Sequence, residues 1–160
     1  MSLSENQPEE VVLSWEQIHQ DCDALAEKLA GRTWRGIIAV TRGGLAPVAL
    51  LSRALDNKMI ETLCMASYDH QDRDKLTVLK TVENIGDGAG WLVVDDLADT
   101  GATFAAVREM LPRAHIACPY VKPAGAPQVD TYLRAYEEQV WLNFPWEMRA
   151  GFTQDRFETY

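Results

Sequence analysis

The sequence lacks the features that mark secreted, membrane-spanning and nucleic-acid-binding proteins. Its three cysteines and three histidines are scattered and form no CxxC pair, so neither a disulfide framework nor a zinc site is predicted. No apolar run approaches the ~20 residues that a membrane-spanning helix needs. Lys and Arg number 15 against 24 Asp and Glu, a net charge of −9, which disfavours a phosphate-binding surface along a nucleic acid. The polar, acidic N-terminus is the opposite of a signal peptide, so we expect a cytoplasmic protein without a nucleic-acid partner.

The composition fits one folded domain. The chain has 160 residues, of which 47% are hydrophobic, and this length is enough to bury a core. We therefore expect a single domain over residues 1–160, with a loose lead-in at 1–13.

The hydrophobic pattern alternates between strands and helices. A helix is predicted from Trp15 to Leu29, because Ser14 and Gln17 form a capping box and Gly31 follows the last apolar position. The other expected elements are strands at 36–40, 59–67, 91–94 and 114–121 and helices at 45–55 and 100–111, with loops at 68–80 and 95–99 and irregular structure at 122–160. This alternation predicts an α/β fold with a mostly parallel sheet, whose ligands bind at the carboxyl ends of the strands.

The segment Val93–Thr103 carries the most chemical information. Asp95 and Asp96 follow an apolar strand, and Asp99 precedes Thr100-Gly101-Ala102-Thr103 at the start of a helix. Backbone amides at a helix N-terminus and threonine hydroxyls can cradle a phosphate monoester. The two preceding acids suit sugar hydroxyls or a hydrated Mg²⁺ ion. Together they describe a site for a phosphorylated ribose, whereas the plainer alternative is that the acids only cap the helix.

This segment resembles the phosphoribosyl pyrophosphate (PRPP) signature of the type I phosphoribosyltransferases. Further segments are similar to the branch of that family that uses xanthine and guanine, and they lie at 41–45, 66–70, 76–80, 121–125 and 141–148. The resemblance covers residues 12–149. One small departure is Ala102, which stands where these relatives often have glycine.

The resemblance implies a role for each residue around the phosphorylated sugar. Arg42 and the amide of Gly43 would hold pyrophosphate, although a plain strand-to-helix turn with a solvated arginine is the alternative. Asp95 and Asp96 would bind ribose hydroxyls and the metal, with Asp96 the expected Mg²⁺ ligand. The phosphate would be held by Asp99, Thr100, Gly101, Ala102 and Thr103.

The resemblance also implies a purine pocket. Asp99 would face the imidazole edge of the base and act as the general base or stabilise the proton there. Lys122 would donate to the oxygen at position six and so select oxo-purines, although a surface lysine is the alternative. Trp141 would stack on the purine, with an ordinary core aromatic as the alternative, and backbone groups of Trp141 and Leu142 would read the substituent at position two.

The implied fold is that of the type I phosphoribosyltransferases, a mostly parallel sheet flanked by helices, with a purine-binding hood at 122–160. Residues 68–80 would form a flexible active-site loop. On a gap-free match, Asp74 stands where the family has an arginine that reaches the pyrophosphate, with Arg73 and Lys75 beside it.

The implied reaction moves the phosphoribosyl group of PRPP to guanine or xanthine, and also to hypoxanthine, and gives GMP, XMP and IMP. The implied assembly is a homotetramer, and some relatives associate with the inner face of a membrane. Two alternatives stay open, namely an enzyme that prefers hypoxanthine and a nucleotide sensor that keeps the fold without strong catalysis.

Overall fold

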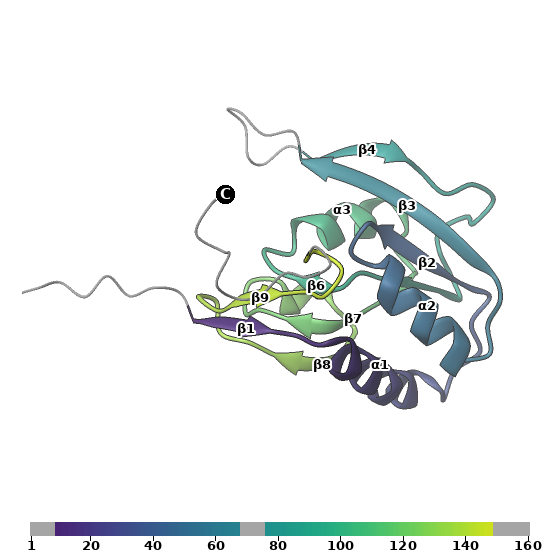
Figure 1. The fold of residues 1–160 in the computed structure, drawn as a ribbon. Helices are drawn as coiled ribbons and strands as arrows, with labels where there is room; N and C mark the ends of the chain where they lie inside the picture. Colours follow the sequence, from purple (N-terminus) through teal and green to yellow (C-terminus); the bar gives the residue numbers. More distant parts are fainter. Residues whose placement is uncertain (1–8, 68–75, 149–160) are drawn as a thin grey trace, which may run out of the picture.

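The structure, a computed structural model, describes residues 9–67 and 76–148. Its elements (Figure 1) are β1 (Glu10–Val12), α1 (Trp15–Leu29), β2 (Gly36–Thr41), α2 (Leu45–Ala54), β3 (Ile60–Ser67), β4 (Leu76–Lys80), β5 (Trp91–Val94), β6 (Leu97–Ala98), α3 (Ala102–Met110), β7 (His115–Val121), the 3₁₀ turn Ala126–Gln128, β8 (Thr131–Ala135) and β9 (Trp141–Asn143). None of the helices in these ranges is long and apolar enough to cross a membrane.

The central sheet is mostly parallel, as the sequence predicts. Its strands run in the order β4-β3-β2-β5-β7-β6, and β8 also pairs with β7. Every pair in it is parallel except β3 with β4, which is antiparallel. All four residues of β5 are buried, which explains why this strand reads as an unbroken apolar run.

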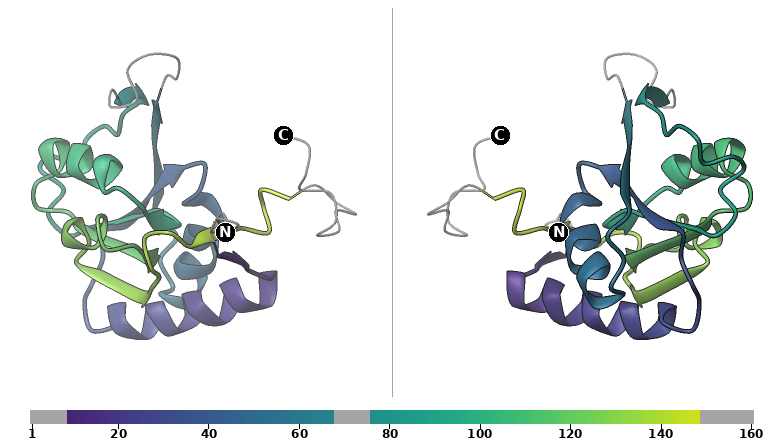
Figure 2. Two further views of the ribbon diagram at one scale, coloured as in Figure 1. Left: turned by 90° about the vertical axis from the view of Figure 1, so that its left-hand side faces the viewer. Right: turned by 90° about the vertical axis from the view of Figure 1, so that its right-hand side faces the viewer.

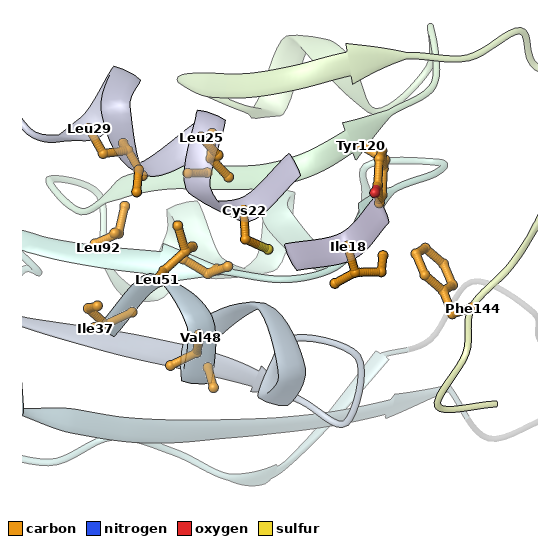
Figure 3. Close-up of a cluster of buried hydrophobic side chains, with 14 of the residues drawn as sticks. Ile18, Cys22, Leu25, Leu29, Ile37, Val48, Leu51, Leu92, Tyr120 and Phe144 are labelled. Atoms are coloured by element: carbon orange, nitrogen blue, oxygen red, sulfur yellow. The ribbon is translucent and has the colours of Figure 1, made fainter. Parts of the chain in front are cut away.

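Helices cover both faces of the sheet, with α1 and α2 on one face and α3 on the other (Figure 2). Consecutive strand residues point to opposite faces, so Leu92 and Val94 pack under α1 and α2 while Val93 packs under α3. Figure 3 shows the cluster of buried hydrophobic side chains between the sheet and helices α1 and α2. One face of α1 contributes Ile18, Cys22, Leu25 and Leu29 to it.

Helix α1 begins where the sequence predicts. The backbone N–H of Gln17 donates to Ser14 Oγ at 3.1 Å, so Ser14 is the N-cap.

Five short strands correct the sequence interpretation. Leu76–Lys80, expected as part of a loop, is the edge strand β4, while residues 68–75 and Asp74 among them lie outside the described residues. Glu10–Val12, expected as a loose lead-in, forms β1 and pairs in parallel with β9. The segment 122–148, expected to be irregular, contains β8 and β9, and the expected loop at 95–99 contains β6. Each of these strands has five residues or fewer, and a pattern with a period of two needs more residues to stand out.

A buried carboxylate fastens α1 to the sheet. Asp21 is only 1% exposed and accepts hydrogen bonds from Tyr120 Oη at 2.7 Å, Gln17 Nε2 at 2.9 Å, and Arg134 Nε and Nη2 at 3.0 and 2.9 Å. Burial acts to raise the pKa of Asp21, but the hydrogen bonds from Arg134, Tyr120 and Gln17 outweigh it and the pKa is lowered. The ionised form of Asp21 is therefore the one that stabilises the fold.

The lowered pKa of Asp21 predicts an acid-dependent loss of stability. A carboxyl group whose pKa is lower in the folded state contributes stability above its unfolded pKa of about 3.9, and that contribution is lost as the pH falls below this value. Asp21→Asn should reduce the free energy of unfolding at pH 7 by roughly 1–3 kcal/mol and should flatten its decrease between pH 5 and pH 3. Urea unfolding followed by circular dichroism measures both effects. Asp23→Asn, on the exposed side of the same helix, is the matched control, and an equal acid sensitivity of both variants would contradict the prediction.

Candidate active site

The predicted site residues follow strands whose carboxyl ends meet at one edge of the sheet. Val94 of β5 lies in register with Ala39 of β2 on one side and with Ala117 of β7 on the other. Because all three strands are parallel, the turn after β2, the acids after β5 and Lys122 after β7 leave the sheet in the same direction.

The turn after β2 packs against the acidic pair. A Cβ atom added to Gly43 would overlap the carboxylate of Asp96, and one added to Gly44 would overlap the carbonyl oxygens of Val94 and Val40. The backbone leaves room only for glycine at Gly44, whereas a side chain at Gly43 would have to displace the Asp96 carboxylate. The Thr41–Arg42 peptide bond is cis, and the side chain of Arg42 is exposed. The sequence-predicted pyrophosphate turn and acid pair are thus in direct contact.

Asp95 and Asp96 form a half-buried pair. The N–H of Asp96 donates to Asp95 Oδ1 at 2.8 Å. Burial and the neighbouring charge of Asp96 raise the pKa of Asp95. Burial also raises the pKa of Asp96, and the negative charge of Glu147 adds to this effect. In the part of the chain that the structure describes, no Lys, Arg or His lies within ion-pair distance of either acid.

The acid pair fits a hydrated Mg²⁺ ion held jointly with a substrate. Mg²⁺ is commonly bound through one or two carboxylates, with water and substrate phosphate oxygens completing the shell. Two adjacent carboxylates with raised pKa values and no cationic partner supply those ligands and gain from a cation. Among residues 9–67 and 76–148, no group of three or more His, Cys, Asp or Glu side chains could hold a metal ion without a substrate.

The segment 99–103 forms a tight turn into α3. Gly101 has a φ of 86°, the left-handed region that favours glycine, and its carbonyl oxygen accepts from Ala105 N at 2.9 Å. The N–H of Ala102 donates to Thr100 Oγ1 at 3.3 Å. Helix α3 begins at Ala102 rather than at Thr100 as predicted, so the amides of the first turn, including that of Thr103, lie at a helix N-terminus as the predicted phosphate cradle requires.

Asp99 and Lys122 lie side by side. Strand β6 pairs with β7 so that Ala98 is in register with Val121, and the next residue on each strand is Asp99 and Lys122. Lys122 Nζ lies 3.3 Å from Asp99 Oδ1, with the lysine side chain 7% exposed and the aspartate 52% exposed. The surface-lysine alternative is therefore wrong.

The loop after Lys122 is held from two sides. Gly125 packs so closely on the carbonyl of Ala98 that a Cβ atom would overlap it. The N–H of Ala124 donates to Glu138 Oε2 at 3.2 Å. Neither Glu138 nor Glu147 is singled out by the sequence analysis, because a lone glutamate in an acidic chain carries no spacing signal.

Trp141 and Leu142 lie on β9, which pairs with β1 rather than with the central sheet. Trp141 is 59% exposed, so the core-aromatic alternative is wrong, whereas the Leu142 side chain is buried. Trp141 N donates to Glu9 O at 2.8 Å and Asn143 O accepts from Leu13 N at 3.0 Å. Neighbouring residues of a strand direct their backbone groups to opposite edges, so the N–H and C=O of Leu142 face away from β1.

The predicted residues thus form two groups. Gly43, Asp95 and Asp96 belong to one, and Asp99 and Lys122 to the other, and the two-residue strand β6 between Asp96 and Asp99 joins them. The hydrogen bonds and ion pairs of the described residues link Trp141 to β1 and not to Asp99 or Lys122. Residues 68–75 and 149–160 lie outside the described residues, so the structure does not test the loop residues around Asp74.

Comparison with known proteins agrees with this arrangement. The phosphoribosyl transferase domain matches residues 12–152. The chain is 47% identical over 146 residues to the xanthine-guanine phosphoribosyltransferase of Chromohalobacter salexigens, covering 91% of this chain and 89% of that protein. It is also 47% identical over 154 residues to the enzyme of the same name from Nitratidesulfovibrio vulgaris, covering 95% and 93%. The crystal structure of a purine phosphoribosyltransferase from Pyrococcus horikoshii superposes with a TM-score of 0.76 at 31% identity, covering 91% of this chain and 99% of that one.

The contact between Gly43 and Asp96 predicts a site-specific cost of adding one methyl group. Gly43→Ala must displace the Asp96 carboxylate, and it should reduce the free energy of unfolding by roughly 1–3 kcal/mol. Gly31→Ala is the matched control, because a Cβ atom there meets no atom within 4 Å. Urea unfolding of both variants measures the difference. If the two are equally stable, the turn after β2 does not pack on Asp96 as described.

Proposed function

The chain belongs to the phosphoribosyltransferase family, and from that premise we propose that it moves the phosphoribosyl group of PRPP to guanine and xanthine, and also to hypoxanthine. The reaction releases pyrophosphate and gives GMP, XMP and IMP. The pairing of Asp99 with the buried Lys122, next to the N-terminus of α3, carries this proposal. It provides one acceptor and one donor for the two edges of an oxo-purine beside a place for a phosphate.

The phosphate-holding residues position the sugar. The amides of the turn 99–103 and the hydroxyls of Thr100 and Thr103 bind the 5′-phosphate of PRPP at the positive end of α3. Arg42 and the amides of Gly43 and Gly44 bind the pyrophosphate group. With both ends of PRPP fixed, the ribose C1 atom is held at a set distance from the purine, and this positioning accounts for much of the rate.

Asp95 and Asp96 bind the ribose hydroxyls and Mg²⁺. Asp96 is the proposed metal ligand, since it lies against Gly43 and therefore next to the pyrophosphate turn. Mg²⁺, when bound, supplies positive charge that neutralises the departing pyrophosphate. The two carboxylates also lie where positive charge develops on the ribose, which their negative charge stabilises.

Asp99 takes the proton of the attacking purine. The bond between ribose C1 and the pyrophosphate oxygen breaks, a ring nitrogen of the imidazole edge bonds to C1, and the proton on that edge passes to the Asp99 carboxylate. Lys122 at 3.3 Å balances the charge of Asp99 in the free enzyme. When a base is bound, Lys122 donates to its oxygen at position six, so an adenine amino group in the same place would face another donor.

The exposed ring of Trp141 stacks on the purine, and the backbone groups of Leu142 read the substituent at position two. Both residues are therefore binding residues, and the chemistry depends on Asp99.

We also propose an oligomeric state and a location in the cell for the enzyme. Apolar side chains are exposed along the sheet edge formed by β3 and β4, namely Ile60, Val78 and Leu79, together with the neighbouring Met59. Exposed apolar side chains on an edge strand support a homo-oligomer, for which we propose the tetramer. We also propose a cytoplasmic enzyme, and association with the inner face of a membrane stays a prediction.

Purine selectivity tests the proposed function and the role of Lys122 together. With PRPP and Mg²⁺, pyrophosphate release should occur with guanine, xanthine and hypoxanthine but not with adenine or uracil. Lys122→Met should lower kcat/KM for guanine roughly 10–100-fold, the loss of one hydrogen bond from a charged group, with little change in PRPP affinity. Lys58→Met, at an exposed loop lysine, is the matched control. Equal losses of guanine use and PRPP binding would make Lys122 structural, and binding of PRPP without turnover of any base would favour the nucleotide sensor.

The role of Asp99 predicts a loss of turnover without a loss of binding. Asp99→Asn keeps the shape and the hydrogen-bonding oxygen but cannot accept the proton, so kcat should fall roughly 10²–10⁴-fold. Calorimetric titration with GMP should show nearly unchanged affinity. Asp23→Asn provides the control for a charge removed elsewhere. Near-normal turnover of Asp99→Asn would exclude it as the general base.

A further inference from the structure

A cavity of about 360 Å³ lies at the end of the sheet opposite the candidate active site. Trp91, the first residue of β5, and His115, the first residue of β7, line it, whereas the active-site residues follow the last residues of these strands. Arg32 and Trp34 come from the loop after α1, and Arg113 comes from the turn after α3. Nothing in the proposed reaction uses these residues.

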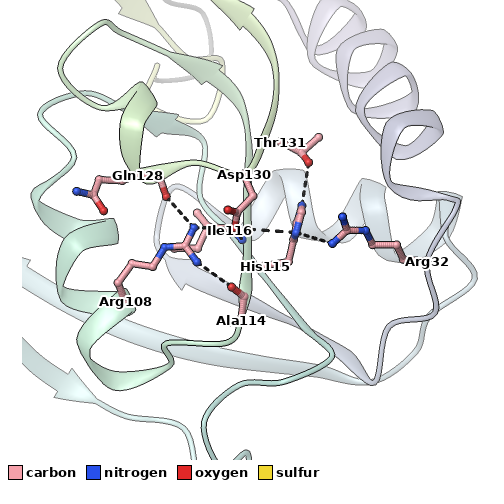
Figure 4. Close-up of polar contacts among 8 residues, drawn as sticks. All are labelled: Arg32, Arg108, Ala114, His115, Ile116, Gln128, Asp130 and Thr131. Carbon is pink, nitrogen blue, oxygen red and sulfur yellow. Dashed lines mark hydrogen bonds and ion pairs between the residues drawn. The ribbon is translucent and has the colours of Figure 1, made fainter.

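Arg108 and His115 line the cavity, and their polar contacts hold them in place (Figure 4). Arg108 donates to the carbonyls of Ala114 at 3.0 Å and Gln128 at 3.3 Å, and its Nη2 lies 2.6 Å from Asp130 Oδ2. These hydrogen bonds hold the Arg108 side chain in the folded protein, so its role here is structural.

His115 also contacts Arg32. His115 Nδ1 lies 3.0 Å from Arg32 Nη1, and His115 Nε2 lies 2.8 Å from Thr131 Oγ1. A guanidinium group can only donate, so Nδ1 accepts and the ring proton is on Nε2. Burial lowers the pKa of His115, Arg32 and Arg108 lower it further, and Asp130 opposes them. His115 is thus a neutral support that orients Arg32 at the cavity.

The charge balance of the cavity favours an anion. Arg108 is matched by Asp130, and Arg113 is matched by Asp87 at 3.3 Å. Arg32 has no acidic partner within ion-pair distance among the described residues. The Arg113–Asp87 pair is 70% and 47% exposed, and such surface pairs contribute little, so Arg113 can turn to a ligand at small cost. An unmatched arginine beside a weakly held one is notable in a chain of net charge −9.

Trp91 forms a buried part of the cavity lining. Its side chain is 5% exposed, and its Nε1 atom is covered by protein and has no hydrogen-bond partner among the residues that the structure describes. The donors that a ligand can reach are those of the exposed Arg32 and Arg113 side chains, so a ligand that uses both must be rich in acceptors.

We propose that this cavity binds a small anion that carries a phosphate group. A phosphate presents several strong acceptor oxygens and a negative charge, which suit the donors and the positive charge of Arg32 and Arg113. The volume lies within the range of small-molecule sites and leaves room for more than the phosphate itself. The phosphate can come from inorganic pyrophosphate or from a nucleotide, and the test separates these two sources.

Tryptophan fluorine signals can distinguish this cavity from the active site in one experiment. The chain has five tryptophans, of which Trp34 and Trp91 line the cavity and Trp141 belongs to the proposed purine site. The intact protein is labelled with 5-fluorotryptophan, its ¹⁹F signals are assigned with Trp→Phe variants, and pyrophosphate or GMP is titrated. We expect the Trp34 and Trp91 signals to shift and saturate, with a midpoint that differs from that of the Trp141 signal. Saturation with pyrophosphate identifies an inorganic ligand, and saturation with GMP alone identifies a nucleotide.

Variants of Arg32 and Arg113, called the rim variants below, test whether these two arginines bind the anion. Arg32→Ala and Arg113→Ala should raise the midpoint of the Trp34 and Trp91 shifts roughly tenfold or more and leave the Trp141 midpoint unchanged. Arg32→Lys, which keeps the charge, should restore part of the affinity. Arg53→Ala is the matched control, since it removes an exposed arginine from the end of α2. The proposal is overturned if the Trp34 and Trp91 signals do not move, if they follow the Trp141 midpoint, or if the rim variants titrate like Arg53→Ala.

Discussion

The parallel pairing of β2, β5 and β7 determines where the turn after β2, the acid pair and Lys122 lie. Parallel neighbours send their carboxyl ends to the same edge, so three turns that are distant in the sequence meet there. Their register is fixed because both faces of these strands are buried, and a shift by one residue would exchange the side chains that face α1 and α2 with those that face α3. The pairing of β6 with β7 applies the same constraint on a smaller scale and brings Asp99 beside Lys122. The chemistry of the site is thus positioned by the sheet, and its loops are short.

In the free protein, several carboxyl groups lie close together at this edge of the sheet. Their mutual repulsion destabilises the folded protein, and a bound substrate with its cation can relieve it. Asp95 and Asp96 are held together with Glu147 nearby, and burial raises the pKa of both aspartates. Such a pair of acids is less stable by itself than with a bound cation and a phosphorylated sugar. The contact of Gly43 with Asp96 couples the pyrophosphate turn to the acid pair, so a ligand at either one acts on the other.

The sequence was sufficient for the parts of the protein that have strong local signals. The buried strands, the helix capped by Ser14 and the acid-rich turn before α3 could be predicted, because each combines a period, a cap or a charge pattern within a few residues. The two-residue strand β6 and the pairing of β1 with β9 could not, since both depend on partners far along the chain. The same limitation applies to the burial of Lys122 and the exposure of Trp141, whose surroundings come from tertiary structure and reverse the usual preference of each residue type. Arg32, His115 and Trp91 had no visible relation in the sequence, because the cavity at the opposite end of the sheet brings together segments that share no motif.

The pairing of β1 with β9 joins Glu10 to Trp141, residues from the two ends of the described chain. During synthesis on the ribosome, β1 emerges first and must wait for almost all the remaining residues before its partner appears. The segment that carries Trp141 and Leu142 therefore completes the fold last, after the sheet that binds the phosphorylated sugar can already have formed. Closing so long a loop costs chain entropy, and a base stacked on Trp141 would help to offset that cost. Bound substrate would then stabilise the pairing of β1 with β9, and the enzyme with substrate bound would resist unfolding and proteolysis better than the free enzyme.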